Sequence, residues 1–517
     1  MSTQCAASTP PETLRPSVRS TFSRDLIDTF ITSGLTVLAL VLTLRLLAQA
    51  LGPEGFGAYS IARRILSTLD PVLTVTMGTA VTRYIALTNN ERIRHNYLLA
   101  GLMIGVAPSM VCLLIGTLCD RQLAGLLFRD GEYRPVIIRT LFLMVGYCFF
   151  IILYSFYRGR GEMRKANLWQ LTVIAIGPLS VAWLFSSSRD VGLILALNAV
   201  LCFTSLAPLL YHTFRRDTAG QGAEKDLESF STCFRELFRY GLTRVPGGFA
   251  FPGILAIGPF LAPYVGTLSH AGYLLAGQSV LRVVEGGTEA LSRVALPRWA
   301  RLSRDENGAT LRARISDVVA FAIHIGTFAT LHLLLWCDQI IVLLLGNEYL
   351  ASTPVLRILI FAVLPFLTYS MLRPIIDAVD PKPVNSRNAC YAFILCAVLS
   401  VVFSLLGLNV MGLAAATAAA LTWLSLLTVR HLVAAYSVST GDLCLLRMGF
   451  LNAVFLALAG ILNLSISHWN ASGLLPQALL GVFFEAILFG AYCLSLWKSG
   501  VPWTVEMVRR FRRVHTT

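Results

Sequence analysis

Charged residues are scarce in this sequence: Asp, Glu, Lys and Arg make up 14% of its 517 residues, and hydrophobic residues make up 56%. A soluble domain carries roughly 25% charged residues. Together with a mean hydropathy of +0.68, this excludes a soluble protein and leaves no room for a separate soluble domain.

Several kinds of site are also missing from the sequence. It has no Gly-rich phosphate loop, no zinc-ligand spacing and no nucleophile elbow, so we expect no enzyme activity, no cofactor and no metal. The 11 cysteines form no C-x-x-C pair and mostly fall in apolar stretches, which is typical of small buried side chains.

Long hydrophobic runs take the place of these motifs. A helix needs about 20 largely apolar residues to cross a bilayer. The segments that meet this requirement are 26–50, 58–86, 97–118, 136–157, 167–187, 191–214, 241–265, 271–295, 315–336, 354–376, 385–406, 411–434, 447–467 and 474–497. They predict an all-α polytopic membrane protein with about fourteen transmembrane helices.

The basic residues that give the net charge of +14 are placed so that they indicate how the chain is oriented in the membrane. With the N-terminus inside, roughly 29 Lys and Arg residues fall in the cytoplasmic gaps and tails and roughly 4 in the outer gaps. This bias predicts that both termini lie in the cytoplasm, in a bacterial inner membrane. Because the basic residues are spread over short gaps, we do not expect a nucleic-acid partner.

The first and second parts of the chain carry similar short patterns. Gly57-Ala58-Tyr59 corresponds to Ala271-Gly272-Tyr273, and Pro135-Val136 to Pro354-Val355, at offsets of 214 to 219 residues. Such repeats are common in transporters. The predicted divisions are a disordered basic cytoplasmic tail at 1–24, a first six-helix lobe at 25–214, a cytoplasmic loop at 215–240, a second six-helix lobe at 241–436, and two extra helices with a basic tail at 437–517.

Several segments resemble polysaccharide-precursor flippases of the Wzx type, in the multidrug/oligosaccharidyl-lipid/polysaccharide exporter superfamily. They are Leu51-Gly52-Pro53-Glu54-Gly55-Phe56-Gly57-Ala58-Tyr59, residues 78–86, Arg158-Gly159-Arg160-Gly161, Tyr240-Gly241-Leu242 and Leu345-Gly346-Asn347-Glu348-Tyr349. The resemblance implies two lobes around a central cavity that opens alternately to either side. It also implies an undecaprenyl-pyrophosphate-linked oligosaccharide as cargo, surrounding membrane lipids as partners, and contacts with polysaccharide polymerase or assembly proteins.

Charges inside predicted spans are costly and usually face protein or water. The candidate contacts for a phosphate head group are Arg45, Arg63, Arg64, Arg244 and Arg282, and the candidate ion-coupling residues are Asp70, Glu285 and Glu289. Asp70 follows Arg63 by seven residues, which places both on one face of a helix, and Arg282, Glu285 and Glu289 also share a face. The alternative is structural, because the charges on each face could pair with one another.

The predicted span at 241–265 is interrupted by helix-breaking residues. Pro246, Gly247, Gly248, Pro252 and Gly253 predict a bent helix. The bend is either a packing feature or a hinge at the start of the second lobe.

We therefore expect a flippase for lipid-linked oligosaccharides used in O-antigen, capsule or exopolysaccharide assembly. One alternative is an ion-coupled antiporter that exports small organic cations, which would need an acidic cavity. A lipid II flippase, and a membrane scaffold or polymerase subunit without a transport cavity, are the others.

Overall fold

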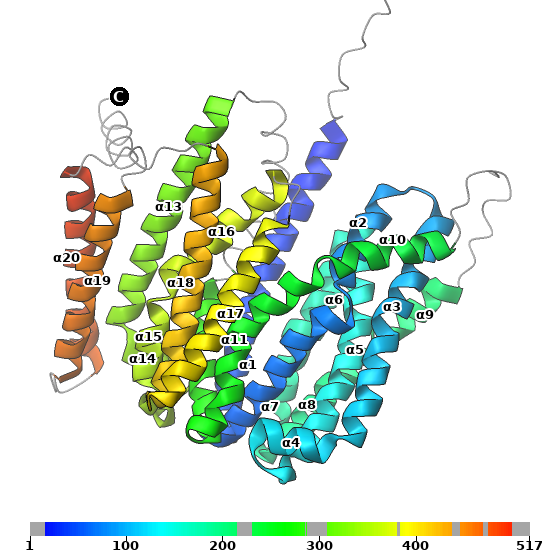
Figure 1. Cartoon of the computed structure of the whole chain (residues 1–517), viewed down its shortest axis with the longest axis horizontal. Coiled ribbons are helices and arrows are strands. Elements are labelled where there is room, and N and C mark those ends of the chain that lie inside the picture. The colour runs from blue at the N-terminus through cyan, green and yellow to red at the C-terminus, as the bar shows by residue number, and fades with distance from the viewer. Residues whose placement is uncertain are drawn as a thin grey trace, which may run out of the picture.

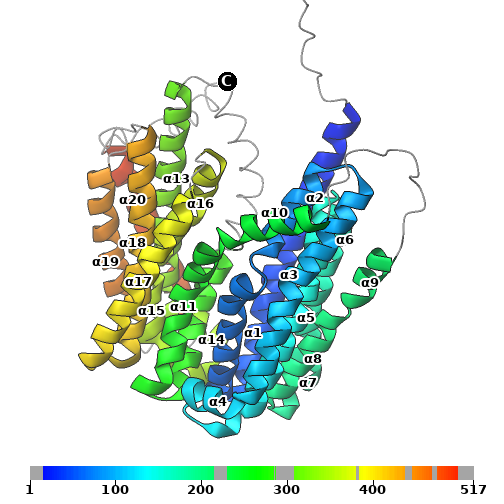
Figure 2. The same cartoon turned by 45° about the vertical axis from the view of Figure 1, so that its right-hand side comes forward.

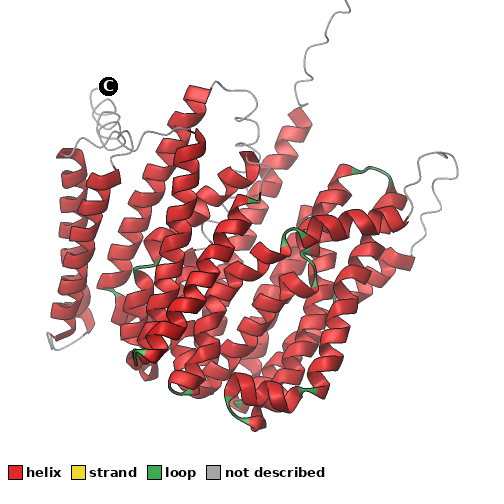
Figure 3. Ribbon diagram, viewed as in Figure 1, coloured by secondary structure: helices red, strands yellow, loops and turns green. Residues whose placement is uncertain are grey.

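The computed structural model describes residues 16–214, 230–284, 286, 308–379, 383–436, 445–468 and 474–498. Every regular element in these ranges is a helix (Figure 3). The all-α prediction is confirmed for the part of the chain that can be described.

Helix α1 (Pro16–Leu73) contains a reversal of the chain at Gly52, whose backbone has φ 66° and ψ 178°. Only glycine adopts this conformation readily. The α5–α6 turn contacts both sides of the reversal: Arg164 pairs with Asp28 before it, and Arg160 pairs with Glu91 after it. Residues 28 and 91 therefore lie at one end of the molecule, and Gly52 lies at the other. Residues 16–24, which we predicted to be disordered, belong to α1.

These contacts define two ends of the molecule. We call the end with the turns at 88–90 and 160–162 the basic end, and the end with the Gly52 turn the far end.

The first bundle forms around α5, which packs against α2, α3 and α8. Its helix starts are fixed by side-chain caps: Asn90 accepts hydrogen bonds from the first turn of α3, and Asp190 does so for α8. The helices after α1 are α2 (Met77–Leu87), α3 (Glu91–Leu118), α4 (Asp120–Phe128), α5 (Arg134–Gly159), α6 (Met163–Gln170), α7 (Gly177–Phe185), α8 (Val191–Phe203) and α9 (Leu206–Phe214). Short turns occur at η1 (Gly131–Tyr133), η2 (Leu171–Ile176, a π-helical turn) and η3 (Ser186–Ser188).

Helix α10 (Phe230–Leu242) occupies part of the predicted cytoplasmic loop. It packs against α3 and α2 of the first bundle. Figures 1 and 2 show it running obliquely to the start of α11. The helical spacing of its apolar residues explains this position, because Cys233 and Leu237, four residues apart on one face, are buried.

In the second bundle, α17 packs against α11 and α18, which also contact each other, and α13 packs against α16. A helix at 268–284 follows α11. The named elements are α11 (Val245–Val265), α13 (Gly308–Leu335), α14 (Cys337–Leu344), η4 (Asn347–Ser352), α15 (Thr353–Ile360), α16 (Val363–Val379), α17 (Val384–Leu405) and α18 (Asn409–Tyr436).

Two further helices, α19 (Leu445–His468) and α20 (Leu474–Lys498), lie beside α13 at the edge of the molecule (Figure 1). Polar side chains join them to α13. Glu485 accepts a hydrogen bond from Trp336 Nε1 (2.9 Å) and contacts His332. Nearer the basic end, the Tyr492 hydroxyl donates to Asn452 (2.8 Å) and lies 3.1 Å from His324 Nδ1.

Nine described helical stretches are long and apolar enough to cross a membrane, or ten if the pair Asn347–Ile360 and Val363–Asp377, bent by 50°, is one span. The stretch Ile27–Leu73 is counted once although it reverses at Gly52. The chain is thus a multi-pass membrane protein, and the number fourteen stays a prediction.

Candidate functional site at the junction of the two bundles

Two glycines bring the backbones of the two bundles together near the far end. A Cβ atom on Gly57 would lie 2.1 Å from the carbonyl oxygen of Leu268, and a Cβ on Gly272 would lie 2.8 Å from the carbonyl oxygen of Pro53. No side chain fits at either position without moving backbone. We call Gly57, Leu268 and Gly272, with Pro53, the glycine contact. It joins the two copies of the pattern that suggested an internal repeat.

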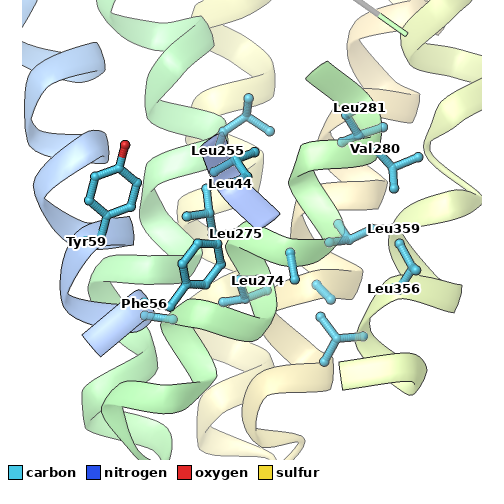
Figure 4. Close-up of a cluster of buried hydrophobic side chains, with 14 of the residues drawn as sticks. Leu44, Phe56, Tyr59, Leu255, Leu274, Leu275, Val280, Leu281, Leu356 and Leu359 are labelled. Atoms are coloured by element: carbon cyan, nitrogen blue, oxygen red, sulfur yellow. The ribbon is translucent and has the colours of Figure 1, made fainter. Parts of the chain in front are cut away.

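Apolar side chains surround the glycine contact. Figure 4 shows Phe56 of α1 next to Leu274 and Leu275 of the 268–284 helix. The Phe56 ring also packs edge-on against Tyr349, with 5.6 Å between the ring centroids. The Tyr349 hydroxyl donates to the carbonyl of Ala48 at 3.0 Å. The far end of the junction is therefore closed by apolar packing and backbone contacts.

Arg64 lies further along the same junction and is 1% exposed. Its Nη2 donates to the side-chain oxygen of Gln278, a fully buried residue of the 268–284 helix. The Gln278 amide nitrogen in turn donates to the carbonyl of Leu255 in α11 at 2.9 Å. Arg64 and Gln278 are 214 residues apart, which is the offset of the repeat. Equivalent positions of the two halves thus meet, as expected at a pseudo-two-fold axis.

Arg63 and Asp70 face a different direction from Arg64. Both lie close enough to Tyr147 of α5 to interact with it electrostatically, and Asp70 also interacts with Cys148. One carboxylate oxygen of Asp70, Oδ1, is buried and has no hydrogen-bond partner among the described residues. Asp70 therefore points into the first bundle.

The predicted span 58–86 is broken just beyond Asp70. Val75 and Thr76 have φ angles of 48° and 52°, which β-branched residues rarely adopt. The Thr76 hydroxyl donates to the carbonyl of Gly241 at 3.1 Å, and a Cβ on Gly241 would lie 2.1 Å from the carbonyl of Val75. A second break, at Thr243 and Arg244, separates α10 from α11. The two breaks lie against each other.

A cluster of aromatic and charged residues lies beside these breaks, toward the basic end. The Arg244 guanidinium lies 3.7 Å from the centroid of the Tyr240 ring, and that of Arg83 lies 4.8 Å from it. Tyr84 packs edge-on against Tyr240. The candidate contacts predicted from the sequence included Arg244 but not Arg83. We call these residues, with Tyr97 and Glu236, the Tyr240 cluster.

The other predicted site residues are spread more widely. Arg45 lies at the far end, where its Nη1 donates to the carbonyl of Leu343 at 2.5 Å and so caps α14. Arg282 is half-buried. Glu285 and Glu289 lie outside the described residues, so the predicted charged face is not defined.

The predicted hinge residues do not themselves break the helix. Pro246 is in the first turn of α11, where proline is compatible with a helix, and Pro252 lies inside the continuous α11. Gly247, Gly248 and Gly253 are sites of close packing, against Ser386, Pro71 and Phe393 respectively.

Some charges outside the spans are paired with one another. At the far end a hydrogen bond from Arg134 lowers the pKa of Asp120. At the basic end burial of Glu162 is outweighed by hydrogen bonds from Lys165 and Arg160, and its pKa is lowered as well. These carboxylates are paired, whereas Asp70 Oδ1 has no hydrogen-bond partner among the described residues. Within the described ranges, no three His, Cys, Asp or Glu side chains lie close enough to hold a metal ion.

Comparison with known proteins gives a family match and several similar folds. The family of polysaccharide biosynthesis proteins matches residues 24–303. No curated protein gives a significant match.

Three solved structures illustrate the fold. A lipid II flippase MurJ in an inward closed conformation is similar with a TM-score of 0.64 and 15% identity, over 91% of this chain and 98% of that one. A multidrug resistance MATE family transporter of the MOP superfamily, inward-facing, has a TM-score of 0.65 and 13% identity, over 78% and 96%. A MOP superfamily transporter from Pyrococcus furiosus has a TM-score of 0.57 and 13% identity, over 80% and 96%. The chain therefore has the fold of MOP superfamily transporters.

Proposed function

The chain belongs to the polysaccharide biosynthesis protein family, and from this premise we propose that it is a flippase for an undecaprenyl-pyrophosphate-linked oligosaccharide. It would move this lipid from the cytoplasmic to the outer leaflet of the inner membrane for surface polysaccharide assembly. The observation that carries the proposal is the buried Arg64, held by Gln278 at the junction of the two bundles.

The cargo explains why a cation belongs at this depth. A sugar-pyrophosphate head group carries about two negative charges, and each unsatisfied polar group in hydrocarbon costs several kcal/mol. Arg64 would offset part of this cost. A buried arginine itself requires anions or hydrogen-bond acceptors. An exporter of organic cations would need the opposite charge at the junction, so Arg64 favours an anionic cargo.

We infer that this conformation is closed to the outside. The positive-inside rule assigns the basic end to the cytoplasm, so the glycine contact lies on the outer side. Alternating access would require residues 25–214 and 241–436 to move as two lobes. Gly57 and Gly272 would separate, and Arg64 would release Gln278 when the head group binds.

The two helix breaks are our proposal for the hinge. Val75 and Thr76 hold strained backbone conformations, and the break at Thr243 and Arg244 contacts them through Gly241. Such strain costs of order 1–3 kcal/mol per residue and persists where the surroundings or the function require it. The hinge would lie just before Pro246 and beside the break in the first lobe.

Asp70 is our candidate for ion coupling. Its buried oxygen Oδ1 has no hydrogen-bond partner among the described residues. Because a buried polar atom without a partner is unfavourable, binding of a proton or a cation there would lower the free energy. Because Asp70 is followed directly by the helix break, a change in its charge would act on the hinge.

The proposed function is tested in proteoliposomes that contain the purified protein and a fluorescent undecaprenyl-pyrophosphate oligosaccharide. We expect the protein to accelerate transfer of this lipid between leaflets, and Arg64→Ala to remove most of the acceleration while the protein remains folded and inserted. Accelerated export of an organic cation such as ethidium, without lipid transfer, would replace the flippase with the antiporter.

A further inference from the structure

We propose that Arg83, Tyr240 and Arg244 form a docking site for a phosphate-bearing lipid head group at the basic end, and that the diphosphate of the cargo binds there before it reaches Arg64. This inference rests on the proposed function and adds a second, separate binding step to it.

The geometry of the site is set by close packing. The approach of Gly241 to the carbonyl of Val75 leaves no space for a side chain, and it brings Tyr240 and Arg244 against α2. Arg83 then reaches the Tyr240 ring from α2, with 4.8 Å to the ring centroid. Arg244 reaches the same ring from the α10–α11 break at 3.7 Å. Two guanidinium groups that are 161 positions apart in the chain therefore share one aromatic ring.

The ring and its neighbours hold these cations in place. Tyr84 packs edge-on against Tyr240 with 5.6 Å between centroids, and its ring is tilted against that of Tyr97 with 5.3 Å. Arg244 Nη1 also donates to the carbonyl of Tyr240 at 3.3 Å. An arginine on an aromatic face keeps most of its N–H groups available at the edge of the guanidinium.

No carboxylate neutralises either arginine within the described part of the chain. The nearest acidic side chain of the cluster, Glu236, accepts a hydrogen bond of 2.6 Å from the Tyr97 hydroxyl through Oε2. Arg160, at the same end, differs because it pairs with both Glu91 and Glu162. Arg83 is exposed and Arg244 is half-buried, so an anion can reach them.

A diphosphate matches two cations held close together. Each guanidinium can donate two hydrogen bonds to one phosphate, and such charge-assisted pairs are among the strongest hydrogen bonds in proteins. A phospholipid has one phosphate diester with a single charge and would engage one arginine well. The paired arrangement therefore favours the cargo over the bulk lipid.

Position supports an entry role. The Tyr240 cluster joins α2 of the first bundle to the break that leads into α11 of the second. A lipid whose head group binds there contacts both sides of the proposed hinge at the cytoplasmic face. The buried Arg64 lies nearer the far end, in α1, where Gln278 of the 268–284 helix joins it to α11.

The test measures lipid binding to the full-length protein in phosphatidylcholine nanodiscs by native mass spectrometry. The probes are undecaprenyl diphosphate, phosphatidylglycerol and inorganic pyrophosphate. We expect Arg83→Ala and Arg244→Ala each to weaken binding of undecaprenyl diphosphate about tenfold, equivalent to about 1.4 kcal/mol. Pyrophosphate should compete with it in the unmodified protein.

The matched control is Arg239→Ala, which removes the same charge from an exposed position of α10 and should leave binding unchanged. Tyr240→Phe keeps the ring and should bind like the unmodified protein, whereas Tyr240→Leu should bind more weakly. In an Arg64→Ala background, binding should persist without transfer between leaflets, and adding Arg244→Ala should then weaken it.

Two outcomes overturn the inference. If the protein flips the cargo but both arginine variants bind undecaprenyl diphosphate normally, the docking site is wrong and the proposed function stands. If phosphatidylglycerol binds as tightly as undecaprenyl diphosphate and depends on the same arginines, the site takes ordinary phospholipid. Failure of the unmodified protein to flip the cargo would instead refute the proposed function.

Discussion

The two ends of the bundle junction are built on different principles. At the far end, Gly57 and Gly272 bring backbone against backbone, and Phe56 packs edge-on against Tyr349. At the basic end, the junction contains two helix breaks, and arginines without carboxylate partners lie on Tyr240. Tight apolar packing resists opening, whereas broken helices and exposed cations permit movement and binding. On this difference we base our proposal that the far end acts as the closure and the basic end as the entrance.

The largest expected effect comes from filling the glycine contact. Gly57→Leu puts a side chain where even a Cβ lies 2.1 Å from the Leu268 carbonyl, so the far end cannot close and lipid transfer should be abolished. Overpacking of this kind costs about 1–3 kcal/mol or more, so the melting temperature should also fall. Gly34→Leu, in the same helix with open space around it, is the control and should keep both properties.

The contact between Arg64 and Gln278 should show strong coupling. Each single alanine variant leaves a buried polar partner behind, so the free energy of unfolding should fall by about 1–3 kcal/mol. In a double-mutant cycle, the loss for the double variant should be smaller than the sum of the single losses. Additive losses would mean that the two side chains do not stabilise the fold through each other. That result would contradict the importance proposed for the hydrogen bond between Arg64 and Gln278.

The attachment of the two extra helices should be weaker than the junction. Glu485→Gln removes the negative charge that faces His332. It also changes the side chain that accepts the hydrogen bond from Trp336 Nε1. Hydrogen bonds between membrane helices are worth about 1 kcal/mol, so we expect a small drop in melting temperature and nearly normal lipid transfer. A loss of transfer as complete as that of Arg64→Ala would place α19 and α20 in the transport machinery.

The smallest effect concerns the surface of the far end. The pKa of Asp120 is lowered by Arg134, so this pair stabilises the folded protein above the ordinary carboxyl pKa of 3.8. That contribution is lost as the pH falls through the lowered value. The difference in melting temperature between the unmodified protein and Asp120→Asn should therefore be small at pH 7 and shrink toward pH 3. A difference that grows on acidification would contradict the pairing.

Some features of this molecule could be predicted from the sequence, because they follow from local patterns. The hydrophobic runs predict the helices. The spacing of Arg63 and Asp70 predicts that they share a helix face, and both residues do lie near Tyr147. The break at Val75 and Thr76 could not be predicted, since neither residue is a helix breaker and the distortion depends on Gly241 from another helix. The Tyr240 cluster was missed for a related reason. Arg83 gives no local signal of its aromatic partner, which lies far away in the chain.

The repeat pattern illustrates the same limit. The repeat matches Gly57 with Ala271 and Ala58 with Gly272, and such a correspondence in sequence does not say that Gly57 and Gly272 touch. Only the packing of α1 against the 268–284 helix brings them together. The repeat thus predicted the architecture, and the structure supplied the contact from which the mechanism is inferred.

The central claim is that the far end opens during transport while the basic end receives the cargo. Distances between spin labels at Leu126 in α4 and Leu350 in η4, both exposed, test it directly, in protein whose exposed Cys119 and Cys493 are replaced by serine. We predict one short distance in the resting protein, and a second, longer one when undecaprenyl diphosphate is added or when Gly57 is replaced by leucine. A single unchanged distance under conditions in which the protein transfers lipid would contradict the account.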